Sequence, residues 1–292
     1  MCSQHYAFGK IPSMISAAIP PPRQWLIFSA LDEALLQTNE RRSLEYLLTQ
    51  LERHGVPVIL NSSLTPRELA SVAEALQLDA PRVAEEGSLI SYPRDLRTRY
   101  MGLDYDQICQ ILDDLREQHV YCFRGFHDWT AEEIAVEASL NLAGARKARQ
   151  RRASELLLWQ DSAERLQQFA LQLRQYELDI WQCERFIRVS ARTGKANAMR
   201  SLHAEYAQQW GYKPFIIAIG NQPDDQAMLL SADIAIIVRN EAEAEVELPS
   251  KVASRLLHVI RTQQEGSAGW QEGVRNLLSL VSLNVESDYI RY

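Results

Sequence analysis

One acidic residue, Asp32, follows a long apolar stretch near the start of the chain. Residues 24–31, QWLIFSAL, contain neither Pro nor Gly, which is typical of a strand buried on both faces of a parallel sheet. Ligands of such sheets bind at the carboxyl ends of the strands, where Asp32 is expected. Phosphoryl chemistry there usually needs two carboxylates, a nucleophile and an acid/base. Asp32 is therefore either the remainder of such a site or a loop residue with local hydrogen bonds.

Further polar residues are expected at the same edge of the sheet. Ser62 follows the apolar residues VPVIL, Lys195 opens a helix in TGKANAM, and Asp224 and Asp225 follow PFIIAIG. A hydroxyl and a compact cation suit an anionic group, and paired carboxylates suit a hard cation. The local alternatives are that Ser62 caps a turn, that Lys195 is solvated, and that the two acids favour a helix N-terminus.

The elements that must position these residues alternate between strands and helices. After the first strand, apolar spacing predicts a helix over 43–54, and the capping box Thr65-Pro66-Arg67-Glu68 begins another. Strands are expected at 56–63 and at 81–90, the latter with a Glu-Glu-Gly turn at 85–87. This β-α-β-α-β order predicts a doubly wound α/β fold. The same rhythm returns near the C-terminus, with expected strands at 214–220 and 233–238 and helices at 195–210, 251–264 and 269–280.

The middle of the chain has a different pattern. A helix is expected over 105–119, and residues 178–183 and 185–190 alternate like antiparallel strands. We therefore predict an N-terminal extension (1–23), a parallel-sheet core (24–91 with 192–292) and an inserted α+β cap domain (92–191).

The composition sets limits on partners and location. Hydrophobic residues make up 46% of the chain and charged residues 24%, as in ordinary globular proteins. The net charge of −7 argues against nucleic acid as a general partner. No apolar run approaches the roughly 18 residues that span a membrane. The four cysteines show no metal-ligand spacing, and reduced thiols in a cytoplasmic protein are the simplest account of them.

The order of motifs resembles the haloacid dehalogenase superfamily, in the branch with a large α/β cap after the third strand. Its first motif, Asp-x-Asp-Gly-Thr, aligns with residues 30–34, ALDEA, and its fourth, Gly-Asp-x-x-x-Asp, aligns with residues 220–225, GNQPDD. Ser62 and Lys195 align with the second and third motifs. Residues 123–135, 145–161 and 266–278 resemble segments of mannosyl-3-phosphoglycerate phosphatase.

The resemblance implies roles for particular residues. It implies catalytic positions at Asp32, Ser62 and Lys195, and a Mg²⁺ site at Asn221, Asp224 and Asp225. It also implies binding of an anionic sugar-phosphate or sugar-glycerate compound by Ser63, Arg152, Ser154 and Glu155.

Two departures from the family pattern bear on activity. The nucleophile position holds Ala30, and the first acid of the fourth motif is replaced by Asn221. A methyl group can neither attack phosphorus nor bind a metal, and a neutral amide is a poorer ligand for Mg²⁺ than a carboxylate. We expect weak Mg²⁺ binding at most and a catalytically inactive ligand-binding or regulatory protein.

Two alternatives stay open. One is an active Mg²⁺-dependent phosphatase with a rearranged site that uses Asp32, Asp224 and Asp225. The other is a partner subunit of a glycosyltransferase that makes a compatible solute. The sequence identifies no protein partner.

Overall fold

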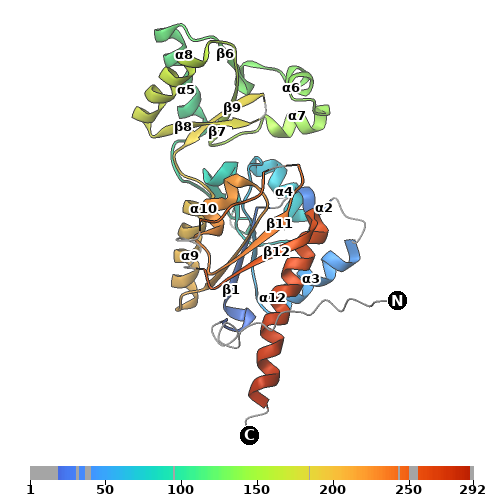
Figure 1. The fold of residues 1–292 in the computed structure, drawn as a ribbon. Helices are drawn as coiled ribbons and strands as arrows, with labels where there is room; N and C mark the ends of the chain where they lie inside the picture. The colour runs from blue at the N-terminus through green and yellow to red at the C-terminus, as the bar shows by residue number, and fades with distance from the viewer. Residues whose placement is uncertain are drawn as a thin grey trace, which may run out of the picture.

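The chain forms two bodies joined by a narrow waist (Figure 1). The computed structural model describes residues 19–30, 33–36, 41–94, 96–183, 185–242, 244–249 and 256–289. The larger body contains a parallel sheet with helices on both faces, and the smaller body contains an antiparallel sheet. Within the described part of the chain, no helix is long and apolar enough to cross a membrane.

The core sheet has five parallel strands in the order β12-β11-β10-β1-β2. These are β1 (Trp25–Ser29), β2 (Val58–Leu60), β10 (Phe215–Gly220), β11 (Ile234–Arg239) and β12 (His258–Glu265). β1 lies between β10 and β2, so the predicted parallel α/β fold is confirmed and two motif-bearing strand ends are neighbours.

Alternate residues of β1 pack on opposite faces of the sheet. Trp25 and Ile27 join one apolar cluster with Trp270, whereas Leu26 and Phe28 join another with Met199. The helices α3 (Arg41–Arg53), α4 (Pro66–Ala75) and α12 (Gly266–Tyr289) cover the first face, and α9 (Lys195–Trp210) and α10 (Gln226–Leu229) cover the second. Both faces are buried, which explains why the strands read as continuous apolar runs.

The strand expected at 81–90 is two strands with a tight turn between them. β3 (Arg82–Ala84), β4 (Leu89–Ser91) and β5 (Thr98–Tyr100) form a small antiparallel sheet, and an isolated parallel bridge joins Asn61 to Val83. The turn η2 (Glu85–Gly87) has positive φ at all three residues, 49°, 59° and 88°. β5 pairs with β4, so residues 98–100, which lie within the segment predicted as the cap (92–191), belong to this small sheet.

The cap sheet has the order β6-β7-β9-β8 and is antiparallel throughout. Its strands are β6 (Phe123–Gly125), β7 (Ser154–Trp159), β8 (Leu178–Cys183) and β9 (Phe186–Ala191), so the predicted antiparallel pair at 178–190 is confirmed. Helices α5 (Tyr105–His119) and α8 (Ala163–Leu173) contribute to one apolar cluster. Helices α6 (Ala131–Glu137) and α7 (Leu142–Ala148) contribute to a second.

The helix expected over 251–264 is wrong where the structure describes it. Residues 258–265 form β12, parallel to β11. In this strand Ile260 and Thr262 are buried, whereas Arg261 and Gln263 are exposed, which is a period of two. Residues 251–255 lie outside the described part of the chain. The expected helix 269–280 lies within α12.

Candidate functional site

The carboxyl ends of β1, β2 and β10 meet at one edge of the core sheet. The Ala30 N–H donates to the Ile219 carbonyl at 2.8 Å, and the Asn61 N–H donates to the Ser29 carbonyl at 2.8 Å. These backbone contacts place Ala30 between the second and fourth motifs, at the position that aligns with a nucleophile, and its methyl group packs against the apolar cluster that contains Leu26 and Phe28. Asp32, the expected acid/base, lies outside the described residues.

Lys195 is buried at the start of α9 and is held by two carboxylates. Its Nζ lies 2.8 Å from Asp225 Oδ1 and 3.4 Å from Glu86 Oε1, and its side chain is 6% exposed. Burial disfavours the ammonium, but the charges of Asp225 and Glu86 outweigh it and raise the pKa of Lys195. The fold thus joins two residues expected from the sequence and adds Glu86, which was expected only in a turn.

The carboxylate of Asp225 is fully engaged by the protein. Oδ1 accepts from Lys195, and Oδ2 accepts from the backbone N–H groups of Asn221 (2.9 Å) and Gln222 (3.1 Å). Asp224, its neighbour, is exposed. In the superfamily that the motifs resemble, Mg²⁺ is generally used, and this ion is usually bound through one or two carboxylates together with water and substrate oxygens. With Ala30, Asn221 and an occupied Asp225, the described residues do not fit such an ion.

The two serines expected near the ligand differ in exposure. Ser62 is fully buried, and its Oγ accepts from the Leu64 N–H at 3.0 Å, which is the turn-capping geometry. Ser63 is exposed. The structure places neither side chain among the residues that line the described cavities.

Two of the expected ligand-binding residues instead join the cap to the core through Glu85. This buried carboxylate accepts from the Arg152 N–H at 2.7 Å, the Ala153 N–H at 3.0 Å and the Ser154 hydroxyl at 2.6 Å. The groups that could bind an anion at 152–154 are therefore satisfied by a side chain of the core. Arg152 presents its guanidinium to the Tyr100 hydroxyl at 3.2 Å.

The last expected ligand-binding residue, Glu155, points into the cap. Successive residues of a strand face opposite sides, so Glu155 turns away from Glu85 while Ser154 faces it. Glu155 is fully buried, and its Oε1 accepts from the Phe126 N–H at 2.5 Å. Burial raises the pKa of Glu155. This placement gives Glu155 a position in the cap interior rather than on the cavity between core and cap.

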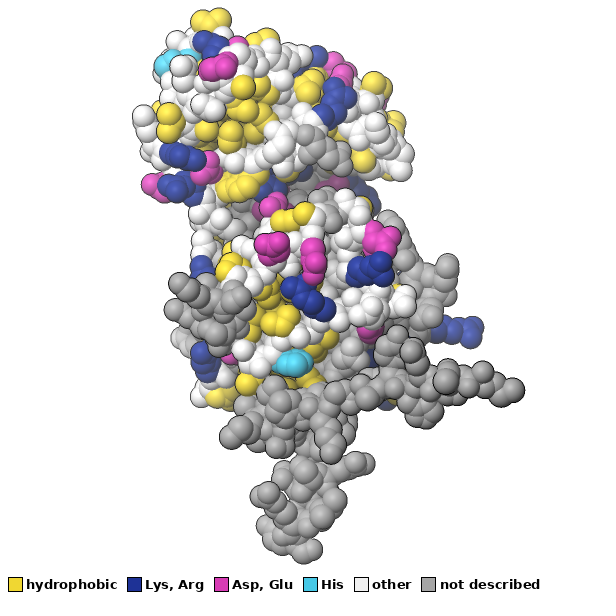
Figure 2. Space-filling model, in the orientation of Figure 1, with side chains coloured by type: hydrophobic (Ala, Val, Ile, Leu, Met, Phe, Trp, Pro, Cys, Tyr) yellow, Lys and Arg dark blue, Asp and Glu magenta, His cyan; other side chains and the backbone are white. Residues whose placement is uncertain are grey.

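A cavity of about 330 Å³ lies between Lys195 and the cap sheet. Charged side chains of both signs gather along the waist on the face shown in Figure 2. The cavity lining includes Glu86, Arg188, Lys195, Arg200 and Asp224, together with Trp181 and residues 193–197. Cap strands β8 and β9 therefore face the first turn of α9 across this cavity.

Arg188 is a charged residue of the cap that lines this cavity. It is 5% exposed, its Nη1 lies 3.6 Å from Glu86 Oε1, and its guanidinium stacks over the Trp181 ring at 5.1 Å. Arg188 is the one charged residue in the apolar segment FIRVSA. Because a buried Arg is rare unless it is paired, this pattern is a signal by which a site residue could be found.

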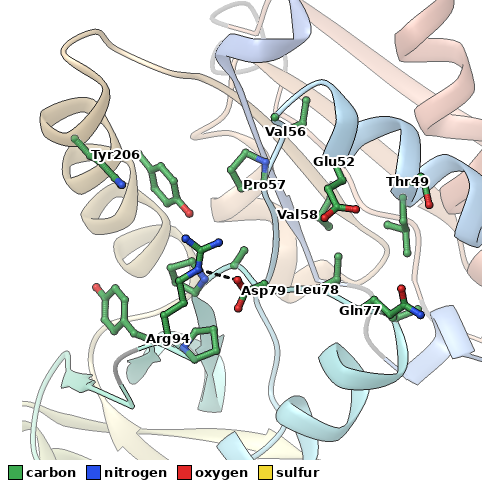
Figure 3. A pocket seen from close by; sticks show the side chains of 18 of the residues that line it. Thr49, Glu52, Val56, Pro57, Val58, Gln77, Leu78, Asp79, Arg94 and Tyr206 are labelled. Carbon is green, nitrogen blue, oxygen red and sulfur yellow. Dashed lines mark hydrogen bonds and ion pairs between the residues drawn. The ribbon is translucent and has the colours of Figure 1, made fainter.

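A larger cavity, about 690 Å³, lies at the opposite edge of the core sheet. Its lining includes Pro57 and Val58 at the start of β2, Tyr206 on α9, and the exposed ion pair of Arg94 with Asp79 (Figure 3). Residues 55–57 and the end of α9 lie before the amino ends of the parallel strands β2 and β10. We assign the site to the smaller cavity because it contains Lys195 and lies at the carboxyl edge, where this sheet type binds ligands.

Gly87 allows the turn η2 to pack directly against α9. Its φ is +88°, and an added Cβ would lie 2.3–2.7 Å from backbone atoms of Gly194 and Lys195. We expect Gly87→Ala to destabilise the protein by more than the control Gly55→Ala, which has φ of +70° and open space around it. Backbone crowding should add about 1–3 kcal/mol to the conformational cost that both share. Urea unfolding of both variants measures the difference; equal losses would contradict this packing.

Comparison with known proteins places this geometry in a family. A sequence profile described as haloacid dehalogenase-like hydrolase matches residues 27–254. A haloacid dehalogenase-like hydrolase from Bacillus subtilis superposes with a TM-score of 0.56 at 17% identity, covering 87% of this chain and 99% of that chain. A phosphatase of the haloalkanoate superfamily from Bacteroides thetaiotaomicron gives 0.57 at 16% identity, covering 87% and 94%. These structures support the fold.

Proposed function

Since the chain belongs to the haloacid dehalogenase-like hydrolase family, we propose that it binds an anionic compound between core and cap without hydrolysing it. The observation that carries this proposal is Ala30, which directly follows β1 and aligns with the nucleophile position of the family's first motif. On this proposal, the protein uses the carboxyl edge of the sheet and the cap to bind, and Ala30 offers no nucleophile for phosphoryl transfer to the protein.

The cavity suits an anion for two reasons. The cations Arg188, Lys195 and Arg200 line it, and α9 begins there after Gly194, which gives no side-chain cap to the helix. The N-terminus of a helix of this length attracts negative charge and offers free backbone N–H groups. Trp181 and Ala191 add an apolar wall suited to the carbon face of a sugar.

The acids in the cavity limit what Lys195 can do. Asp225 and Glu86 already balance its charge, so Lys195 neutralises less of a phosphate than an unpaired ammonium would. Arg188 and Arg200 are then the cations with most capacity for a ligand. We propose a sugar-glycerate or sugar-phosphate compound as the ligand, on the resemblance of the cap segments to mannosyl-3-phosphoglycerate phosphatase.

Binding measurements on cavity variants test the proposal. Calorimetric titration with a glycosyl-glycerate and with its phosphorylated form should give saturable binding to the unaltered protein. Arg188→Gln should weaken it roughly 10- to 100-fold, the equivalent of one charge-assisted hydrogen bond. Because Arg188 is buried, Arg200→Gln at an exposed position of the lining provides a second variant that is not expected to affect folding.

The matched control is Arg192→Gln, an exposed residue near the same strand whose guanidinium pairs with Asp179 and does not line the cavity. It should bind like the unaltered protein. Equal losses in all three variants would indicate general charge attraction, and no binding of either compound would overturn the ligand assignment.

A further inference from the structure

A second cluster of reactive side chains lies inside the cap, away from the cavity. Cys109 of α5, His127 of η3 (Phe126–Asp128) and Glu155 of β7 bring one sulfur, one ring nitrogen and one carboxylate oxygen within 4.8 Å of one another. Glu155 is fully buried, and Cys109 and His127 are partly exposed. The three residues come from three separate elements, so only the folded cap assembles them.

The orientation of His127 leaves one ring nitrogen for a ligand. Its Nε2 lies 3.4 Å from Asp113 Oδ1 and 3.3 Å from Asp128 Oδ1, contacts that favour a hydrogen on Nε2. Its Nδ1 is buried and has no hydrogen-bond partner among the described residues. A histidine that gives one N–H to a carboxylate and directs the other nitrogen inward has the geometry of a metal ligand.

Gly125 keeps the space beside this nitrogen open. An added Cβ at Gly125 would lie 3.0 Å from His127 Nδ1 and 3.0 Å from Glu155 Oε1. A side chain at this position would crowd both atoms. The close approach of the Gly125 backbone and the unpartnered Nδ1 of His127 are two independent observations. Both concern the space between His127 and Glu155.

We propose that Cys109 Sγ, His127 Nδ1 and a Glu155 carboxylate oxygen bind a zinc-type divalent cation within the cap. Tetrahedral zinc with these donors has bonds of about 2.0–2.3 Å, which sets donor separations of roughly 3.3–3.8 Å. The Cys109 Sγ already lies 3.9 Å from Glu155 Oε2, so small side-chain rotations bring the donors into range. A water molecule completes the fourth position.

The donor chemistry selects the metal class. Sulfur, imidazole and one carboxylate favour Zn²⁺ or Co²⁺ over Mg²⁺, which prefers oxygen ligands. Burial and the Glu155 charge raise the pKa of Cys109 to about 12, so the metal-free protein holds a thiol. On binding, the S–H bond breaks as the sulfur–metal bond forms, and the proton leaves to the buffer.

Titration of the chelator-treated full chain with Co²⁺ tests the site directly. One equivalent should produce a sulfur-to-cobalt charge-transfer band in the near ultraviolet, and Zn²⁺ should abolish it. Cys109→Ser should lose the band, and Cys122→Ser, an exposed cysteine of the cap, should keep it. Asp128→Asn should weaken Co²⁺ binding roughly 10- to 100-fold, because the Asp128 carboxylate orients the His127 ring through its contact with Nε2.

A second measurement needs no substitution and so is independent of variant folding. At alkaline pH, where a fraction of Cys109 is the reactive thiolate, Zn²⁺ should slow its alkylation at least about tenfold, because the metal occupies the sulfur lone pair that attacks the reagent. Alkylation of Cys122 should be unchanged, as read by peptide mass spectrometry. Absence of both the band and the protection would overturn the proposal. A band that persists in Cys109→Ser would also overturn it, since the sulfur would then belong to another cysteine.

Discussion

The purified protein should show no Mg²⁺-dependent hydrolysis of phosphomonoesters or of phosphoglycerate-bearing glycosides above background. Enzymes of this class supply up to about 10²¹-fold acceleration, much of it through a covalent nucleophile and metal clamping. Ala30 cannot form an aspartyl-phosphate, and Asn221 gives no charge to hold Mg²⁺. Loss of a nucleophile alone costs on the order of 10⁶-fold in a serine protease. A sensitive phosphate-release assay makes the measurement.

The companion variant restores the missing carboxylates. Ala30→Asp with Asn221→Asp places two acids on neighbouring strand ends, since Ala30 already bonds to Ile219 of β10. Adding Glu86→Gln should raise turnover further, because this carboxylate repels a phosphate beside Lys195. Glu33→Gly and Ala34→Thr complete the family's first motif. Turnover in these variants would show a retained phosphatase scaffold. Strong turnover by the unaltered protein, abolished by Asp32→Asn, would instead show a working, rearranged site.

Lys195→Met should destabilise the folded protein by about 3–5 kcal/mol, the usual cost of removing one partner of a buried ion pair. The change leaves Asp225, 1% exposed, without its ammonium partner. Urea unfolding, followed by tryptophan fluorescence, to which the buried core residues Trp25 and Trp270 contribute, provides the measurement. A loss below about 1 kcal/mol would mean that the pair is solvated.

Two controls separate the charge effect from packing. Arg94→Met breaks an exposed pair with Asp79 and should change stability by at most about 1 kcal/mol. Lys195→Met combined with Asp225→Asn and Glu86→Gln should recover part of the loss, because no buried carboxylate is then left unpaired.

The core was predictable because its signals are local. Residues 24–31 and 214–220 are long apolar runs, and burial on both faces of one sheet is the simplest outcome for them. β12 was not predictable in this way. Leu256, Leu257 and Ile260 also fit helical spacing, and the choice of strand depends on pairing with β11, which is a contact distant in sequence.

The candidate site was predictable at strand ends and not elsewhere. Lys195 and Asp225 were expected together because motifs in order place them at one edge, and they form an ion pair. Glu86 lies in the site because the turn η2 adopts a left-handed backbone, and Arg188 lies in it because the cap packs against the core. Neither cause produces a periodic pattern in the sequence. The positions of Cys109 and His127 were not predictable for the same reason, since only the folded cap brings them close to Glu155.

Glu85 has a consequence for the rigidity of the waist between core and cap. It accepts three hydrogen bonds from residues 152–154 of the cap while it is fully buried in the core. Each hydrogen bond to a charged group is worth about 1.5–3 kcal/mol net, so separating cap from core is a rare event. The cavity itself is open to solvent, because Arg200 and Asp224 of its lining are exposed. Glu85 therefore stiffens the waist, and a ligand meets a cavity whose width is already set.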